Sequence, residues 1–252
     1  MNADGPSMVR TTTTSVRIVE ALQDLDGAGV TELATHLDIS KSAVYKHLAT
    51  LHRLGYVRRR GDTYLVGLKF LHLGLYARDR LPVFTVGSDA VERLADATGH
   101  TTSLMVKNAG YGVYVRRLPG HDEDPIREGD QVPLHATAAG KAILAFLDEA
   151  DREAVLDRIG LSARTEKTIT SRARLEKELR SIRDQRLSFD REEYAEGYQC
   201  VASPVVGSDG YAVGAVSVSG PMNRMTGKTL EEDVTGLVVS TAKSIENGLL
   251  SR

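Results

Sequence analysis

Residues 40–66 read SKSAVYKHLATLHRLGYVRRRGDTYLV, and they give the clearest indication of the fold of the amino-terminal part of the chain. Its first half has a helical pattern of apolar residues, with Ser40 as the expected N-cap and Gly55 after the expected end. The side chains that face inward are expected to be Val44, Leu48 and Leu51.

Two shorter helices are predicted before Ser40. Ser15 precedes a pattern of apolar residues at helical spacing, and glycines 27 and 29 end it. Thr31 is the expected N-cap of a second helix, which ends before a tight turn at Asp38 and Ile39. Three helices with a tight turn between the second and the third predict a helix-turn-helix within residues 14–67, after a flexible arm at residues 1–13.

A hairpin is predicted directly after the third helix. Two alternating segments, 56–58 and 63–66, flank Gly61-Asp62, and a pair that begins with glycine suits a type II′ turn. The hairpin carries Arg58, Arg59 and Arg60 and is the wing of a winged helix-turn-helix.

The charge distribution indicates a nucleic-acid partner. The net charge is −2, but residues 40–61 hold six Lys or Arg residues and no acidic residue. A basic patch in a nearly neutral chain is typical of a DNA-binding module. We expect the third helix to meet base edges in the major groove of double-stranded DNA and the arginines to meet phosphates or the minor groove. The expected DNA-binding residues are Ser40, Lys41, Ser42, Tyr45, Lys46, Arg58, Arg59 and Arg60.

Residues 68–81 predict a linker helix that is apolar over a wide arc, with Leu68, Leu71 and Leu75 along it. The small winged domain cannot cover that arc alone, so the helix is expected to pair with a second copy of the chain.

Residues 82–252 predict an α+β domain with an antiparallel sheet. A helix from Pro82 to about Thr98 precedes two strands around Asn108-Ala109-Gly110, which is a hairpin signal. Further helices and strands follow, and a closing helix is expected from about Leu230 to Leu250.

Several separated motifs resemble those of the IclR family of transcriptional regulators. They are YLVGL at 64–68, HATAAGKA at 135–142, GYQCVASP at 197–204 and SVSGP at 217–221. The resemblance implies a winged helix-turn-helix joined to a GAF-like effector-binding domain, working as a homodimer or a dimer of dimers. It also implies an effector pocket that includes Asp190, Cys200, Ser217 and Ser219.

The residue types agree with a small organic acid as effector. Ser217 and Ser219 are two apart on a predicted strand, so their hydroxyls share one face. The start of a predicted helix at Thr137, Ala138, Ala139 and Gly140 offers free backbone N–H groups to a carboxylate. The sequence thus predicts a regulator whose operator binding responds to a small carboxylate. An effector-independent architectural DNA-binding protein is the alternative.

Other classes of function fit less well. A single cysteine excludes a disulfide framework and a cysteine-based zinc finger, and the sequence shows no motif for a catalytic or metal site. We expect no enzyme activity and no cofactor. No apolar run is long enough to span a membrane and Met1 to Thr14 lacks the apolar core of a signal peptide, so a cytoplasmic location is expected.

Overall fold

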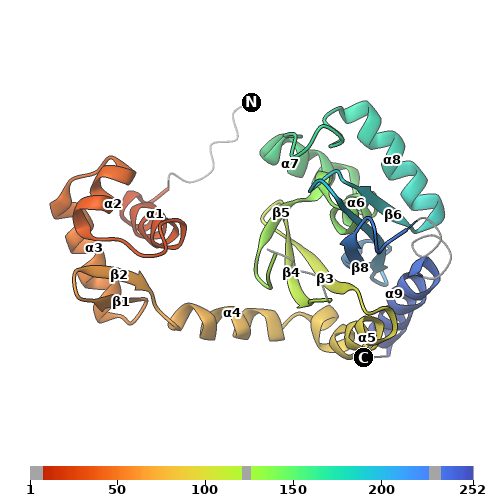
Figure 1. Cartoon of the computed structure of the whole chain (residues 1–252), viewed down its shortest axis with the longest axis horizontal. Helices are drawn as coiled ribbons and strands as arrows, with labels where there is room; N and C mark the ends of the chain where they lie inside the picture. The colour runs from red at the N-terminus through yellow and green to blue at the C-terminus, as the bar shows by residue number, and fades with distance from the viewer. Residues whose placement is uncertain (1–7, 121–125, 227–233, 252) are drawn as a thin grey trace. The chain divides into compact units, whose positions relative to one another are not determined.

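The structure is a computed structural model that describes residues 8–120, 126–226 and 234–251. The chain divides into two compact units, the first ending at Arg78 and the second beginning at Asp79. The division falls inside the predicted linker helix (Figure 1).

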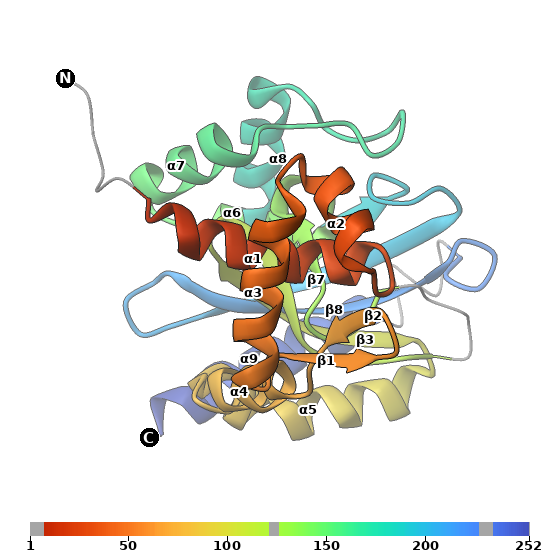
Figure 2. The ribbon, with the colours of Figure 1, turned by 90° about the vertical axis from the view of Figure 1, so that its left-hand side faces the viewer.

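The amino-terminal unit is a winged helix-turn-helix. Its elements are the helices α1 (Arg10–Asp24), α2 (Val30–Leu37) and α3 (Lys41–Arg53) and the strands β1 (Val57–Arg60) and β2 (Thr63–Val66). Figure 2 shows the three helices grouped together, with the β1–β2 hairpin beside α3. All three helices and both strands contribute to one apolar core, which includes Ile18, Leu22, Leu33, Val44, Leu48, Val57 and Tyr64.

Helix α1 begins earlier than predicted. It starts at Arg10, so Ser15 lies inside the helix and is not its N-cap. The Ser15 hydroxyl instead contacts Nδ1 of His47 at 2.8 Å, which ties α1 to α3. The expected flexible arm is therefore wrong for residues 10–13, and residues 1–7 of the arm lie outside the described residues.

The hairpin turn agrees with the prediction. Arg60 pairs with Thr63, which leaves Gly61 and Asp62 as the two loop residues. Gly61 has a φ of +62°, and a positive φ at the first loop residue is the requirement of a type II′ turn.

Two helices lead into the second unit. Helix α4 (Lys69–Asp79) corresponds to the predicted linker helix and has no buried residue. Helix α5 (Pro82–Thr98) has its proline in the first turn, where the missing N–H needs no partner, and ends at Gly99 in the left-handed conformation.

The second unit contains a six-stranded antiparallel sheet, as its α+β pattern predicts. The strands lie in the order β5 (Gln131–Pro133), β4 (Tyr111–Leu118), β3 (Thr101–Asn108), β8 (Ala212–Pro221), β7 (Tyr198–Val206) and β6 (Ser188–Arg191). The edge strands β5 and β6 have only three and four residues, too few to show an alternating pattern, and are not predicted.

Helices cover both faces of the sheet. Helices α5 and α9 (Thr235–Leu250) lie side by side against one face (Figure 1). Helix α6 (Ala138–Ala145) packs on the other face, and α8 (Arg172–Gln185) packs against α6. Helix α7 (Glu149–Ile159) contributes to the same apolar core. The first four residues of the predicted closing helix, 230–233, lie outside the described residues.

Helix α6 is buried along its whole length, and a short 3₁₀ turn (Leu134–Ala136) precedes it. No helix in the described parts of the chain is both long enough and apolar enough to cross a membrane.

We expect Gly140→Ala to destabilise the second unit. A Cβ at position 140 would lie 2.2 Å from the carbonyl oxygen of Leu134, so the backbone must move, and overpacking of this kind costs about 1–3 kcal/mol. The matched control is Gly236→Ala in α9, where a Cβ would meet nothing within 4 Å. Denaturant unfolding of the two variants checks the difference, and equal midpoints would contradict the close approach of α6 to Leu134.

Candidate functional site

The predicted DNA-contacting side of α3 is exposed. The side chain of Ser40 accepts a hydrogen bond from the Ala43 N–H at 3.1 Å, which confirms it as the N-cap. Val44 and Leu48 are fully buried, and the residues predicted to meet base edges all lie on the exposed part of the helix surface. These are Lys41, Ser42, Tyr45 and Lys46.

The three arginines of the wing are exposed but differ in their contacts. Arg59 donates to the Asp62 carboxylate at 3.0 Å and to the Gly61 carbonyl at 2.7 Å, and its guanidinium lies 5.6 Å from the centre of the Tyr64 ring. Arg58 and Arg60 flank Arg59 on the strand, so their side chains leave from the opposite face. Arg59 therefore shapes the hairpin tip, whereas Arg58 and Arg60 are the better candidates for phosphate contacts.

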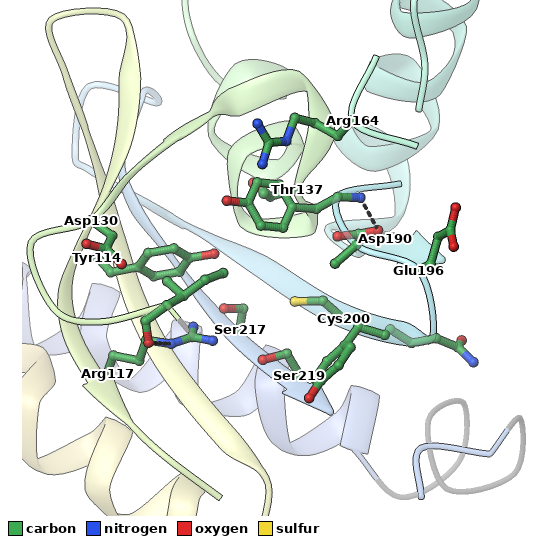
Figure 3. A pocket seen from close by; sticks show the side chains of 15 residues that line it. Tyr114, Arg117, Asp130, Thr137, Arg164, Asp190, Glu196, Cys200, Ser217 and Ser219 are labelled. Carbon is green, nitrogen blue, oxygen red and sulfur yellow. Dashed lines mark hydrogen bonds between the residues drawn. The ribbon is translucent and has the colours of Figure 1, made fainter. Parts of the chain in front are cut away.

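The second unit contains a cavity of about 410 Å³ at the sheet face that α6 covers. Strand register brings three of its polar residues into one row, because Cys200 pairs with Ser219 on one side and with Asp190 on the other. Figure 3 shows Cys200, Ser217 and Ser219 pointing toward the cavity, with Tyr114 and Arg117 from β4 beside them. The lining residues are Tyr114, Arg117, Ile126, Asp130, Thr137, Arg164, Asp190, Tyr194, Ala195, Glu196, Tyr198, Gln199, Cys200, Ser217 and Ser219.

Five of the eight predicted effector-binding residues line this cavity: Thr137, Asp190, Cys200, Ser217 and Ser219. Ala138, Ala139 and Gly140 lie outside the lining and are buried in the core. The Gly140 N–H already donates to the Thr137 hydroxyl at 3.0 Å. The cavity thus meets the start of α6 through the Thr137 side chain, and a contact of Ala138–Gly140 with an anion stays a prediction.

Two arginines that line the cavity are not predicted from the sequence. Arg117 is only 9% exposed, and its guanidinium donates to the Ser103 hydroxyl at 2.7 Å and to the Ile126 carbonyl at 3.2 Å. That guanidinium also lies 4.7 Å from the centre of the Tyr114 ring. Arg164 lies 5.1 Å from the centre of the Tyr194 ring, in a segment that carries no recognisable motif.

A signal for Arg117 is present in the sequence. Arg116 and Arg117 are consecutive in a predicted strand, so their side chains must leave from opposite faces of the sheet. Arg116 forms ion pairs with Glu92 and Glu128, and Arg117 is the cation that enters the cavity.

Burial favours the neutral forms of two titratable groups in the cavity. Asp190 is 7% exposed, and burial raises the pKa of its carboxyl to about 7, although its Oδ1 accepts hydrogen bonds from the backbone N–H groups of Glu193 and Tyr194. Burial and the neighbouring Asp190 raise the pKa of the Cys200 thiol to about 12. The thiol therefore stays protonated and is a poor nucleophile at neutral pH.

The chemistry of the cavity suits binding better than turnover. Among the described residues that line it, there is no histidine or lysine to act as a base beside Cys200. The described parts of the chain contain no group of three or more His, Cys, Asp or Glu residues placed to hold a metal ion. The lining does offer guanidinium and hydroxyl donors beside aromatic rings.

Comparison with known proteins gives two family matches, each covering one part of the chain. A family described as "Bacterial transcriptional regulator IclR C-terminal" matches residues 76–247, and a family described as "IclR helix-turn-helix domain" matches residues 14–61. The "Probable HTH-type transcriptional regulator ArcR" of Halobacterium salinarum is 31% identical, over 97% of this chain and 95% of that protein.

Solved structures show the same similarity. The crystal structure of the Thermotoga maritima IclR is 30% identical with a TM-score of 0.77, and the match covers 95% of this chain and 98% of that one. An IclR homolog from Microbacterium hydrocarbonoxydans, solved in complex with 4-hydroxybenzoate, is 20% identical and has a TM-score of 0.79 over 96% of this chain and 100% of that one, which shows the fold alone. This chain belongs to the IclR family of transcriptional regulators, which are helix-turn-helix DNA-binding proteins and not enzymes.

Proposed function

We propose that the protein binds a pseudo-palindromic operator in double-stranded DNA and that a small carboxylate in the cavity modulates this binding. The observation that carries the proposal is the buried guanidinium of Arg117 in the same cavity as the hydroxyls of Ser217 and Ser219. A regulator of this kind acts where the DNA is, so we place it in the cytoplasm.

The DNA-binding part of the proposal rests on exposure and charge. Lys41, Tyr45 and Lys46 are exposed near the start of α3, which is the end that a recognition helix presents to base edges. Arg58 and Arg60 are exposed on the wing, where phosphate contacts would add affinity without sequence preference.

The effector part rests on the donors in the cavity. An arginine guanidinium binds a carboxylate through two parallel hydrogen bonds, and such charge-assisted bonds are stronger than those between neutral groups. Because burial raises the pKa of Asp190 to about 7, its carboxyl repels an anionic ligand less than an ordinary aspartate would. The rings of Tyr114 and Tyr194 supply apolar walls. The relative solved with 4-hydroxybenzoate makes that acid a sensible first probe.

The proposed assembly is a homodimer or a dimer of dimers. Helix α4 and the residue before it expose large apolar side chains, with Leu68 80%, Leu71 58% and Tyr76 59% accessible. A contiguous exposed apolar surface of this kind marks a protein interface, and a dimer matches the two half-sites of a palindromic operator.

We expect Arg60→Ala to weaken binding to all DNA sequences alike and to reduce the slope of log K against log salt by about 0.9 for each phosphate that is no longer neutralised. Lys46→Ala should instead change the preferred sequence, because a contact to a base edge carries specificity. Fluorescence anisotropy with the protein's own upstream DNA, at several salt concentrations, measures both. Arg180→Ala, at an exposed position on α8, is the control and should leave binding unchanged. If neither Arg60→Ala nor Lys46→Ala alters binding, the assigned surface is wrong.

We expect Leu71→Asp to disrupt the assembly and to weaken operator binding, because a charge in an apolar interface is costly and a monomer reaches one half-site only. Sedimentation velocity gives the mass of the variant. Arg78→Ala, near the end of the same helix, changes no apolar residue and should keep the assembly. An unchanged mass for Leu71→Asp would contradict an interface through α4.

We expect a small acid to raise the melting temperature by binding the folded state, and its uncharged amide to do so much less. 4-Hydroxybenzoate against 4-hydroxybenzamide is the first pair, followed by a keto acid and a sugar acid. Ser219→Ala removes one hydrogen bond to a charged group, so the affinity should fall roughly 10- to 150-fold.

Ser208→Ala, in the exposed turn between β7 and β8, is the matched control. DNA binding by the Ser219→Ala variant should persist while its response to the acid is lost. A screen in which no acid stabilises the protein would favour the architectural alternative, and steady consumption of the acid would favour an enzyme.

A further inference from the structure

One wall of the cavity is a short segment without regular structure. It runs between β6 and β7 and contributes Tyr194, Ala195 and Glu196 to the lining. A ligand that fills the cavity contacts this segment, so whatever holds the segment in place also sets access to the cavity.

The backbone at the start of the segment is held by side chains from elsewhere in the fold. The Asp190 carboxylate accepts from the N–H groups of Glu193 and Tyr194 at 2.7 and 3.3 Å. The hydroxyls of Thr165 and Thr168 donate to the carbonyls of Glu192 and Glu193 at 2.7 and 2.6 Å. Glu192 itself has a φ of +64°, a conformation that a residue with a side chain keeps only when its surroundings impose it.

A buried charge makes a further attachment to the segment. Lys141 lies in α6, is fully buried, and its Nζ is 2.5 Å from Oε1 of Glu193 and 3.6 Å from Oε1 of Glu178. The other residues of α6 are alanine, glycine, isoleucine or leucine and are all buried as well, so Lys141 is the one ionisable group in this helix. A buried ammonium group is strongly destabilising when its partner is removed, so α6 holds the Glu193 carboxylate where it is.

The position of Glu193 links this ion pair to the cavity. Its side chain is 12% exposed and points to Lys141, while its backbone N–H is bound by Asp190, and the next residue, Tyr194, faces the cavity. The Arg164 guanidinium lies over the Tyr194 ring on the same wall. Movement of Glu193 away from Lys141 would therefore move Tyr194 and the wall with it.

We propose that the ion pair between Lys141 and Glu193 is a latch that holds the segment from Glu192 to Glu196 in place as a wall of the cavity, and that Lys141 is thus a positioning residue for the ligand. The effect on ligand affinity rests on the effector binding proposed above. The position of the segment does not rest on effector binding, and it can be measured without any ligand.

Cys200 provides that measurement. It is the single cysteine of the chain, it lines the cavity and it is only partly exposed, so an increase in its rate of alkylation by N-ethylmaleimide reports displacement of the wall. Lys141→Met keeps an unbranched side chain that is one atom shorter and removes the charge, and should raise the labelling rate by roughly 10- to 100-fold. Lys107→Met, which removes a surface ion pair with Asp151, is the matched control and should label as slowly as the unmodified protein.

The dependence of the labelling rate on urea concentration separates opening of the wall from global unfolding. Local opening exposes little surface, so the labelling rate of Lys141→Met should depend weakly on urea at low concentration. A rate that follows the global unfolding equilibrium would mean that Lys141 stabilises the core only, and would overturn the proposal.

A double-mutant cycle tests whether the two residues act on each other. Glu193→Gln keeps the size of the side chain and leaves Glu178 at 3.6 Å as a counter-ion for Lys141, so it provides the test even if Lys141→Met fails to fold. Each single variant should label faster, and the double variant should label no faster than the faster single one. If the labelling rate of the double variant rises by the product of the two single increases, the two side chains act independently and the latch is contradicted.

The ligand measurements distinguish this proposal from the proposed function. 4-Hydroxybenzoate, or another acid that stabilises the unmodified protein, should protect Cys200 and should bind the Lys141→Met and Glu193→Gln variants about tenfold or more weakly. If no acid protects Cys200 but the variants still label faster, the latch stands and the effector proposal fails. If an acid binds all variants equally and their labelling rates match the control, the latch is wrong and the effector proposal stands.

Discussion

The antiparallel pairing of β8 with β3 and β7 is the constraint on which the cavity depends. Side chains alternate between the two faces of a strand, so a slip of one residue would send Ser217 and Ser219 to the apolar face against α5 and α9. The observed register instead pairs Ser217 with Ser103 and Ser219 with Cys200, all on the α6 side. Valines at the intervening positions, such as Val216 and Val218, fill the opposite core and lock that register.

The polar groups on the cavity side are held in place by the surrounding fold. A hydroxyl, a backbone carbonyl and the Tyr114 ring fix the guanidinium of Arg117 at the cavity wall. Burial raises the pKa of the Asp190 carboxyl, and its Oδ1 accepts a hydrogen bond from the Glu193 N–H in the neighbouring wall. Lys141 lies behind that wall, where its charge is matched by Glu193 and Glu178. These contacts are the basis of the anionic ligand and of the movable wall proposed above.

The DNA-binding surface depends on a separate, small core. Val57 and Tyr64 of the hairpin pack into the same cluster as Val44 and Leu48 of α3, and Ala28 forms an isolated bridge with Tyr64. The wing is thereby oriented with respect to the recognition helix by apolar contacts on its inner face. Arg58 and Arg60 leave the strand from the face opposite Val57 and are exposed to solvent.

The helix-turn-helix, the type II′ hairpin and the antiparallel α+β character of the second unit are predictable from the sequence, because capping residues, turn glycines and apolar periodicity are local signals. The polar positions of β7 and β8 are predictable as well. Three features come from the folded chain alone. Arg117 and Arg164 line the same cavity as these positions, residues 138–140 lie outside its lining, and Lys141 forms an ion pair with Glu193. Periodicity shows that a side chain faces inward, but which inward-facing side chains meet depends on strand order and on loops far apart in the chain.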